Sequence, residues 1–119
     1  MVPTPTWDAR AHEETVETFE SLRDRITVHV WGGDWCPDCR SQLPDFAAAL
    51  SAAEVPDDAV HQHPVDRQKE GELVSAYDVE YIPTVVVEID GETVARFVES
   101  ADRPIATTLA DQLAERTEP

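Results

Sequence analysis

Cys36 and Cys39 stand three residues apart, a spacing at which two thiols can close one reversible disulfide. They are the only cysteines in the sequence, so no other pair competes for the bridge and no odd thiol remains. A C-x-x-C pair between a strand and a helix is typical of a dithiol redox site. The flanks fit this setting, because a β-branched run at Ile26–Val30 ends at Gly32 and Gly33, and an amphipathic segment follows the pair.

The attacking species in thiol–disulfide exchange is a thiolate, so the site must favour one ionised and accessible sulfur. Cys36 is expected at a helix N-terminus, where free N–H groups and partial positive charge favour an anion. Cys39 is expected almost one turn inside the helix and more deeply buried. The implied mechanism has two steps: Cys36 attacks a substrate disulfide, and Cys39 then resolves the mixed disulfide.

Pro37 and Asp38 lie between the cysteines and are predicted to tune the couple. Pro37 fits the first turn of a helix, where its missing N–H costs nothing. Asp38 stabilises the same turn, but its carboxylate repels a thiolate beside it. A less favoured thiolate makes a dithiol more reducing, so a reductant is predicted rather than an oxidase.

The elements that must position this motif follow from hydrophobic periodicity. They predict an α/β domain in the order α-β-α-β-α-β-β-α, with a central mixed sheet of about four strands flanked by helices. Residues 1–8 are predicted to form a flexible N-terminal arm, and 9–119 one domain. The predicted helices cover 9–25, the motif to Leu50, 70–77 and a last segment from Asp102. The predicted strands cover 26–30, 59–65, 85–89 and 93–98.

Three further features sharpen this outline. Pro44 is expected to kink the helix that follows the cysteines. Asp90 and Gly91 predict a type I′ turn between the last two strands. The second strand is expected to lie parallel to the first after a right-handed crossover.

The chain resembles the thioredoxin family over roughly residues 9–116. The segment Trp35-Cys36-Pro37-Asp38-Cys39 looks like the W-C-x-x-C site of that family, Pro44 falls where the family kinks its helix, and Ile82-Pro83-Thr84 looks like its I-P-T. The resemblance implies a cis Ile82–Pro83 bond facing the disulfide. Ile82 would then pair with an extended substrate by strand-like hydrogen bonds. An ordinary trans proline at an edge strand is the alternative.

Trp35 is expected to leave its ring partly exposed beside Cys36, the alternative being a core aromatic. Two departures from the family pattern concern proton transfer and the substrate groove. Val30 and Gln62 occupy the positions of the family's buried aspartate and its lysine partner, and Glu99 replaces a glycine beside the groove. Without the aspartate and lysine of the family, water or a nearby group such as Asp38 or a histidine would carry the proton during thiol–disulfide exchange.

Composition excludes some partners. The sequence has 25 acidic and 9 basic residues, a net charge of −16, so nucleic acid and anionic membranes are not expected to bind. Lys69 is the only lysine. An acidic surface poor in lysine favours an origin at high salt, where screening relieves self-repulsion. An acidic cytosolic protein in ordinary salt is the alternative.

The N-terminus has no basic and apolar leader, and no stretch approaches the length of a membrane span. A cytoplasmic monomer without a cofactor is expected. The expected partners are client proteins with disulfides and an upstream disulfide reductase of the thioredoxin reductase type. Two other functions stay open: a metal site built from Cys36, Cys39, His61 and His63, and a module of the same fold that captures partners without turnover.

Overall fold

The computed structural model describes residues 3–33, 35–68, 70–99 and 103–117. One sheet and three α-helices account for most of this chain. The helices are α1 (Glu13–Leu22), α2 (Pro37–Ala52) and α3 (Ile105–Thr117), and the strands are β1 (Ile26–Gly32), β2 (Val60–Pro64), β3 (Thr84–Ile89) and β4 (Glu92–Val98). Short 3-10 turns precede α1 and β2, at Ala9–His12 and Asp57–Ala59.

The sheet is mixed, as predicted, and its strands lie in the order β2-β1-β3-β4. The β2 strand runs parallel to β1, while β3 pairs antiparallel with both β1 and β4. The central strand β1 extends to Gly32, beyond the predicted end at Val30. The chain passes from β1 into the cysteine motif within a few residues, so a largely buried central strand positions the motif.

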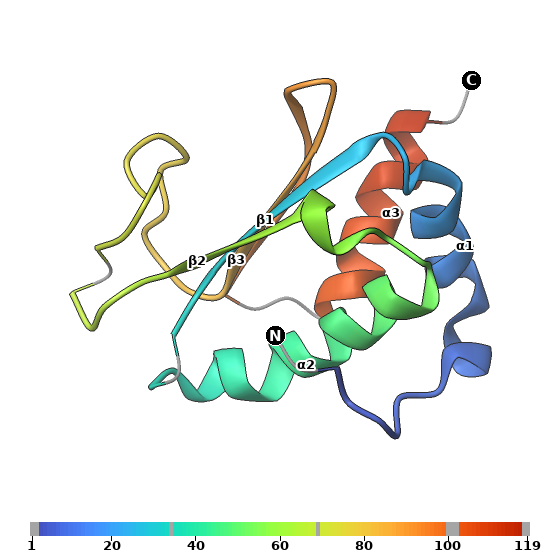
Figure 1. Cartoon of the computed structure of the whole chain (residues 1–119), viewed down its shortest axis with the longest axis horizontal. Helices are drawn as coiled ribbons and strands as arrows, with labels where there is room; N and C mark the ends of the chain where they lie inside the picture. The colour runs from blue at the N-terminus through green and yellow to red at the C-terminus, as the bar shows by residue number, and fades with distance from the viewer. Residues whose placement is uncertain (1–2, 34, 69, 100–102, 118–119) are drawn as a thin grey trace.

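The two faces of the sheet are covered differently. Figure 1 shows α1, α2 and α3 gathered on one side of the sheet, while the segment between β2 and β3 runs over the other side. We call the described residues 65–68 and 70–82 the cover segment. The side chains of β1 alternate between these faces: Gly32 meets α2 at Leu43 and Cys39, whereas Trp31 reaches the cover segment with its indole N–H.

The prediction of a helix over 70–77 is wrong. The cover segment contains only turns there, and Leu73 and Asp78 adopt positive φ values of 63° and 53°, which interrupt a right-handed helix. A helix of eight residues depends on tertiary packing for its stability. Here the sheet side chains bind the segment's carbonyl groups instead: Trp31 donates to Glu72 O, and Arg96 donates to Tyr77 O.

The hairpin between β3 and β4 forms as predicted. Asp90 and Gly91 have φ values of 53° and 82°, the two positive angles that a type I′ turn requires. The outer edge of β4 is covered by a side chain of α3. Gln112 accepts the Arg96 backbone N–H at 2.8 Å and donates to the Arg96 carbonyl at 3.0 Å, as a neighbouring strand would.

The remaining predictions concern the chain ends. Thr4 donates its backbone N–H to the carbonyl of Pro44 in α2, and the ring of Trp7 stacks on His12. Flexibility of residues 1–8 stays a prediction. The predicted cap at Asp102 lies outside the described residues. In the part of the chain that the structure describes, no helix is long and apolar enough to cross a membrane.

Candidate active site

Cys36 caps the N-terminus of α2. Its sulfur accepts the backbone N–H of Cys39 at 3.2 Å, and its own N–H bonds to Gly33 O at 3.1 Å. Pro37 follows in the first turn, as predicted, where no N–H is required. The sulfur therefore lies where free backbone N–H groups and the helix dipole favour negative charge.

Cys39 is placed to keep its proton. Burial raises the pKa of its thiol to about 12, and its hydrogen bond to Cys36 and the charges of Cys36 and Asp38 act in the same direction. A backbone hydrogen bond from Gly33 opposes these effects. Both cysteines are free thiols in this structure. Both cysteines are buried, with Cys36 5% and Cys39 3% exposed, so the expected difference in accessibility is small. The two thiols differ in position instead: Cys36 caps α2, while Cys39 lies inside the helix and releases its proton reluctantly.

The glycines before the motif allow this close packing. A Cβ on Gly32 would lie 3.3 Å from the sulfur of Cys39, and a Cβ on Gly33 would lie 2.5 Å from the indole nitrogen of Trp35. A side chain at Gly33 would therefore displace Trp35. The indole N–H of Trp35 donates to the carbonyl of Val65 at 3.2 Å, which ties the motif to the start of the cover segment.

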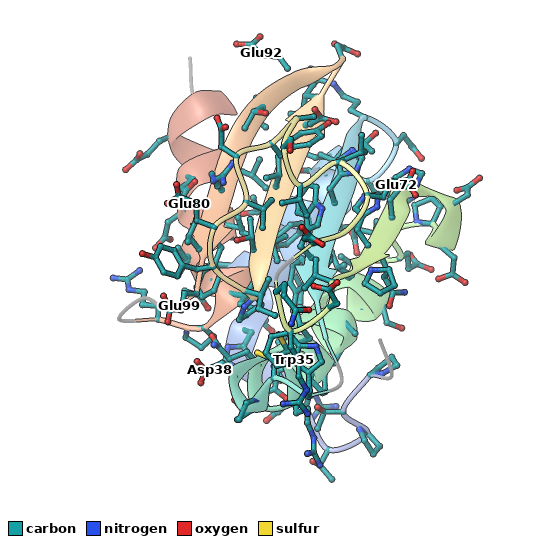
Figure 2. All side chains as sticks on the ribbon, turned by 90° about the vertical axis from the view of Figure 1, so that its left-hand side faces the viewer. Trp35, Asp38, Glu72, Glu80, Glu92 and Glu99 are labelled. Atoms are coloured by element: carbon teal, nitrogen blue, oxygen red, sulfur yellow. The ribbon has the colours of Figure 1, made fainter. Side chains whose placement is uncertain are left out.

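Trp35 is partly buried, and the guanidinium of Arg67 lies 5.7 Å from the centre of its ring. Figure 2 shows a sulfur atom between the labelled side chains of Trp35 and Asp38, with Glu99 on the same side as Asp38. Asp38 is exposed in the first turn of α2. The Trp35 ring is therefore neither a fully buried core aromatic nor fully exposed, and its role beside Cys36 stays a prediction.

The cis proline belongs to the same surface. The Ile82–Pro83 peptide bond is cis, as the resemblance implied, and both residues are buried beside exposed Tyr81. Glu99 joins this bond to α2, because its N–H donates to Pro83 O at 2.7 Å and its carbonyl accepts from Gln42 Nε2 at 3.0 Å. Sequence reasoning did not identify Gln42.

A groove of about 250 Å³ opens beside Cys39. Val30 and Gln62 line this groove. These are the two positions where the family's proton-relay pair would stand. Arg40 and His63 are the other titratable residues among the lining residues that the structure describes, and no carboxylate is among them. The described lining of the groove therefore offers no carboxylate to take up the Cys39 proton.

The histidines of β2 do not join the cysteines in a metal site. Among the described residues, no group of three or more His, Cys, Asp or Glu side chains is arranged to hold a metal ion. His61 is exposed, whereas His63 is buried and bonds to His29 on the neighbouring strand. The sequence contained a signal for this contact, because the side chains at alternate positions of paired strands share one face.

A family model described as Thioredoxin matches residues 6–113. A thioredoxin from Fasciola hepatica has 25% sequence identity and a TM-score of 0.53, covering 83% of this chain and 88% of its own. A thioredoxin variant from Halobacterium salinarum has 24% identity and a TM-score of 0.54, covering 99% of this chain and 89% of its own. The fold and the paired cysteines define a dithiol protein, and the chain belongs to the thioredoxin family.

A curated relative in Arabidopsis thaliana, protein disulfide isomerase-like 1-4, is 40% identical over 58 residues. That match covers 49% of this chain but only 9% of the longer protein. Family membership and the Cys36–Cys39 pair support thiol–disulfide oxidoreductase chemistry in general.

Proposed function

We propose that this protein reduces disulfide bonds in client proteins through a reversible Cys36–Cys39 dithiol. The observation that carries the proposal is the contrast between the two sulfurs. Cys36 accepts an N–H at the start of α2, while burial keeps Cys39 protonated with a pKa of about 12. This contrast supports a first attack by Cys36 and resolution by Cys39.

The reaction balances within the two proteins. The Cys36 thiolate attacks one sulfur of the client disulfide, which forms a mixed disulfide and releases the other client sulfur as a thiolate. Cys39 then loses its proton and attacks the Cys36 sulfur, which closes the Cys36–Cys39 disulfide. The second client sulfur leaves as a thiolate, and both client thiolates take up protons. The client gains two electrons and this protein loses two.

The proton of Cys39 leaves through the groove beside it. The positions of Val30 and Gln62 offer no carboxylate–lysine pair, and the groove opens to solvent. Water that enters the groove can accept the proton as the Cys39 sulfur attacks. The mixed disulfide helps this step, because its formation removes the negative charge of Cys36 that opposes ionisation of Cys39.

Trp35, Ile82 and Pro83 would form the client surface. An extended client segment can pair with the backbone at Ile82, next to the cis proline, while the Trp35 ring supplies apolar contact. An upstream disulfide reductase of the thioredoxin reductase type would then reduce the Cys36–Cys39 disulfide and regenerate the dithiol. We further propose a cytoplasmic monomer that works at high salt.

Insulin reduction in the presence of dithiothreitol tests the proposal. We expect the wild-type protein to accelerate the reaction and Cys36→Ser to abolish the acceleration. Activity retained in Cys36→Ser would contradict the assignment of the nucleophile. No acceleration by the wild type, with one zinc ion bound per chain, would support a metal-binding protein instead. No acceleration, no zinc and capture of clients without turnover would indicate a binding module.

A further inference from the structure

A buried polar network crosses the sheet under the cover segment, away from α2. Glu88 of β3, His29 of β1 and His63 of β2 lie side by side on one face. His29 Nε2 is 3.0 Å from Glu88 Oε1, and His29 Nδ1 is 2.9 Å from His63 Nε2. Tyr77 of the cover segment donates its hydroxyl to Glu88 Oε2 at 2.9 Å. The proposed reduction mechanism uses none of these four side chains.

The hydrogen-bond distances within this network limit the number of protons that its side chains can bind. The hydrogen bond to Glu88 raises the pKa of Tyr77, so the phenol stays a donor. A carboxylate only accepts, so His29 carries a proton on Nε2. One proton then lies between His29 Nδ1 and His63 Nε2. A second proton there would set two N–H groups 2.9 Å apart with no acceptor between them.

The closed pair can therefore carry at most one positive charge. Even that charge is disfavoured at His63, because burial and the nearby charge of His29 lower its pKa below the usual value. If the segment lifts and the two rings separate in water, each can bind its own proton. The open form thus binds at least one proton more than the closed form in acid, so acid favours opening.

Other charged groups face the pair from each packed element. They are His61 on β2, Glu88 on β3 and Glu72 on the cover segment, together with the neutral phenol of Tyr77; Arg96 on β4 contacts the backbone of the cover segment. Glu72 raises the pKa of His63, but its effect is smaller than that of burial. Arg96 is occupied by the carbonyls of Tyr77 and Asp78. The carboxylate of Glu88 already accepts two hydrogen bonds, one from His29 and the other from Tyr77.

Both ends of the cover segment reach the redox site. At its start, the carbonyl of Val65 holds the indole of Trp35. At its end, Ile82 precedes the cis proline. Figure 2 shows the segment passing in front of the strands, with Trp35 below it. Loss of the network would therefore loosen the two parts of the structure that the proposed function assigns to client binding.

We propose that Glu88, His29 and His63 are positioning residues that hold the cover segment on the sheet at neutral pH and release it in acid, which weakens client binding. The network has its full effect above about pH 7.5 and loses it as the pH falls through about 6.5, the ordinary value for histidine. One extra proton in the open form changes the opening equilibrium about 30-fold between pH 7.5 and pH 5.0.

Amide hydrogen exchange tests the opening of the cover segment and does not depend on any disulfide-reduction activity. The amides of Tyr77 and Val79 bond within the segment, to Leu73 O and Val74 O. We expect their protection, corrected for intrinsic exchange, to fall about 30-fold from pH 7.5 to pH 5.0, while Val28 and Val86 in the sheet keep theirs. Equal protection of the segment amides at both pH values would overturn the proposal. This comparison uses the wild-type protein alone.

His63→Gln separates the protonation from the packing. The Gln amide can still donate to His29 Nδ1 but does not titrate. We expect this variant to keep segment protection at pH 5.0. His61→Gln is the matched control, because it removes an exposed ring from the same face of the same strand. It should lose protection in acid as the wild type does. A His63→Gln protein with the same acid loss as the wild type would contradict the role of His63.

The coupling to the site rests on the proposed function and has its own measurement. We expect KM for oxidised insulin to rise several-fold between pH 7.5 and pH 5.5 in the wild type and in His61→Gln, and to rise less in His63→Gln. A KM that rises equally in all three proteins would refute the coupling. Absence of turnover at every pH would refute the proposed function, while the exchange result would still decide whether the network opens.

Discussion

Cys36 and Cys39 differ because of their positions within one turn of helix. The sulfur of Cys36 accepts the N–H of Cys39, so the first residue of the motif occupies the position where a side-chain acceptor caps a helix. Cys39 is already inside the helix and is covered by the sheet at Gly32. A spacing of three residues therefore places two identical side chains in different electrostatic surroundings.

Alkylation of the reduced protein tests this difference. With a pKa of about 12, Cys39 is a thiolate in only about one molecule in ten thousand at pH 8. We expect iodoacetamide to modify Cys36 first and Cys39 at least 100-fold more slowly, as followed by peptide mass spectrometry. Labelling of Cys39 in Cys36→Ser should still be slow at pH 8, because burial, the largest cause of the raised pKa, remains in that variant. Comparable labelling of both residues at pH 8 would contradict this picture.

Asp38 is predicted to tune the reducing strength of the pair. Its carboxylate lies in the first turn of α2, which Cys36 caps, so it repels a thiolate at Cys36, the charged form that would stabilise the dithiol state. Removing this charge by Asp38→Asn should favour the dithiol form and raise the reduction potential by about 10–30 mV. Equilibration with glutathione at fixed salt gives the potential.

Asp45→Asn is the control for that measurement. Asp45 is an exposed aspartate further along α2, so its replacement changes the net charge equally but not the charge beside the sulfurs. We expect the potential of Asp45→Asn to match that of the wild type. Equal shifts in both variants would attribute the effect to net charge, and no shift in Asp38→Asn would show that this side chain does not act on the couple.

The sequence predicted the residues of the site that share a local motif. Cys36, Pro37, Asp38 and Cys39 lie within one turn, so their relative placement follows from helix geometry. The network of His29, Glu88 and Tyr77 could not be predicted in the same way. Its members come from separate elements, and their contacts depend on strand register and on the path of the cover segment.

At the scale of elements, the strands were predictable and the cover segment was not. Each strand carries β-branched residues and is bounded by turn residues, and the D-G turn determines its hairpin locally. The apolar residues Leu73, Val74 and Tyr77 have helical spacing, but Leu73 is 40% exposed and Tyr77 bonds to Glu88. Side chains of the sheet decided the conformation of this segment, and a local pattern contains no information about them.

Arg96 is predicted to be a second anchor of the cover segment, beside the network of Glu88, His29 and His63. Its guanidinium donates to Tyr77 O at 2.7 Å and to Asp78 O at 3.1 Å. Arg96→Met keeps most of the apolar stem but removes both bonds, and we expect a loss of about 1–3 kcal/mol in the free energy of unfolding. Urea titration at constant salt measures it.

Arg25→Met serves as the comparison for Arg96→Met. Arg25 is exposed at the turn before β1, so its replacement should change stability by less than about 0.5 kcal/mol. We also expect a protease to cut Arg96→Met faster within the cover segment. If both variants lose the same stability and neither is cut faster, Arg96 does not anchor the segment.

At the scale of the whole molecule, charge is the dominant feature. A net charge of −16 on 119 residues creates strong self-repulsion when the counterion concentration is low. At molar salt the Debye length is about 3 Å, so charges on neighbouring side chains are largely screened from one another. The composition therefore supports the proposal of a protein that works at high salt.

The salt dependence of the fold checks that proposal. We expect the melting temperature to fall and the circular dichroism signal to weaken as sodium chloride drops below about 0.5 M, because screening is lost. Sucrose at matched viscosity serves as the control, since it stabilises compact states without screening charge. An unchanged melting temperature between molar and millimolar salt would rule out the dependence.

Trapping of the mixed disulfide tests the central claim most directly. Each single variant, Cys36→Ser and Cys39→Ser, is mixed at molar salt with a client peptide that contains one disulfide, and intact mass is measured. Our account predicts that Cys39→Ser accumulates a covalent adduct through Cys36, because no resolving thiol remains, and that Cys36→Ser forms almost none. An adduct that accumulates on Cys39 in Cys36→Ser, or no adduct on either variant, would contradict it.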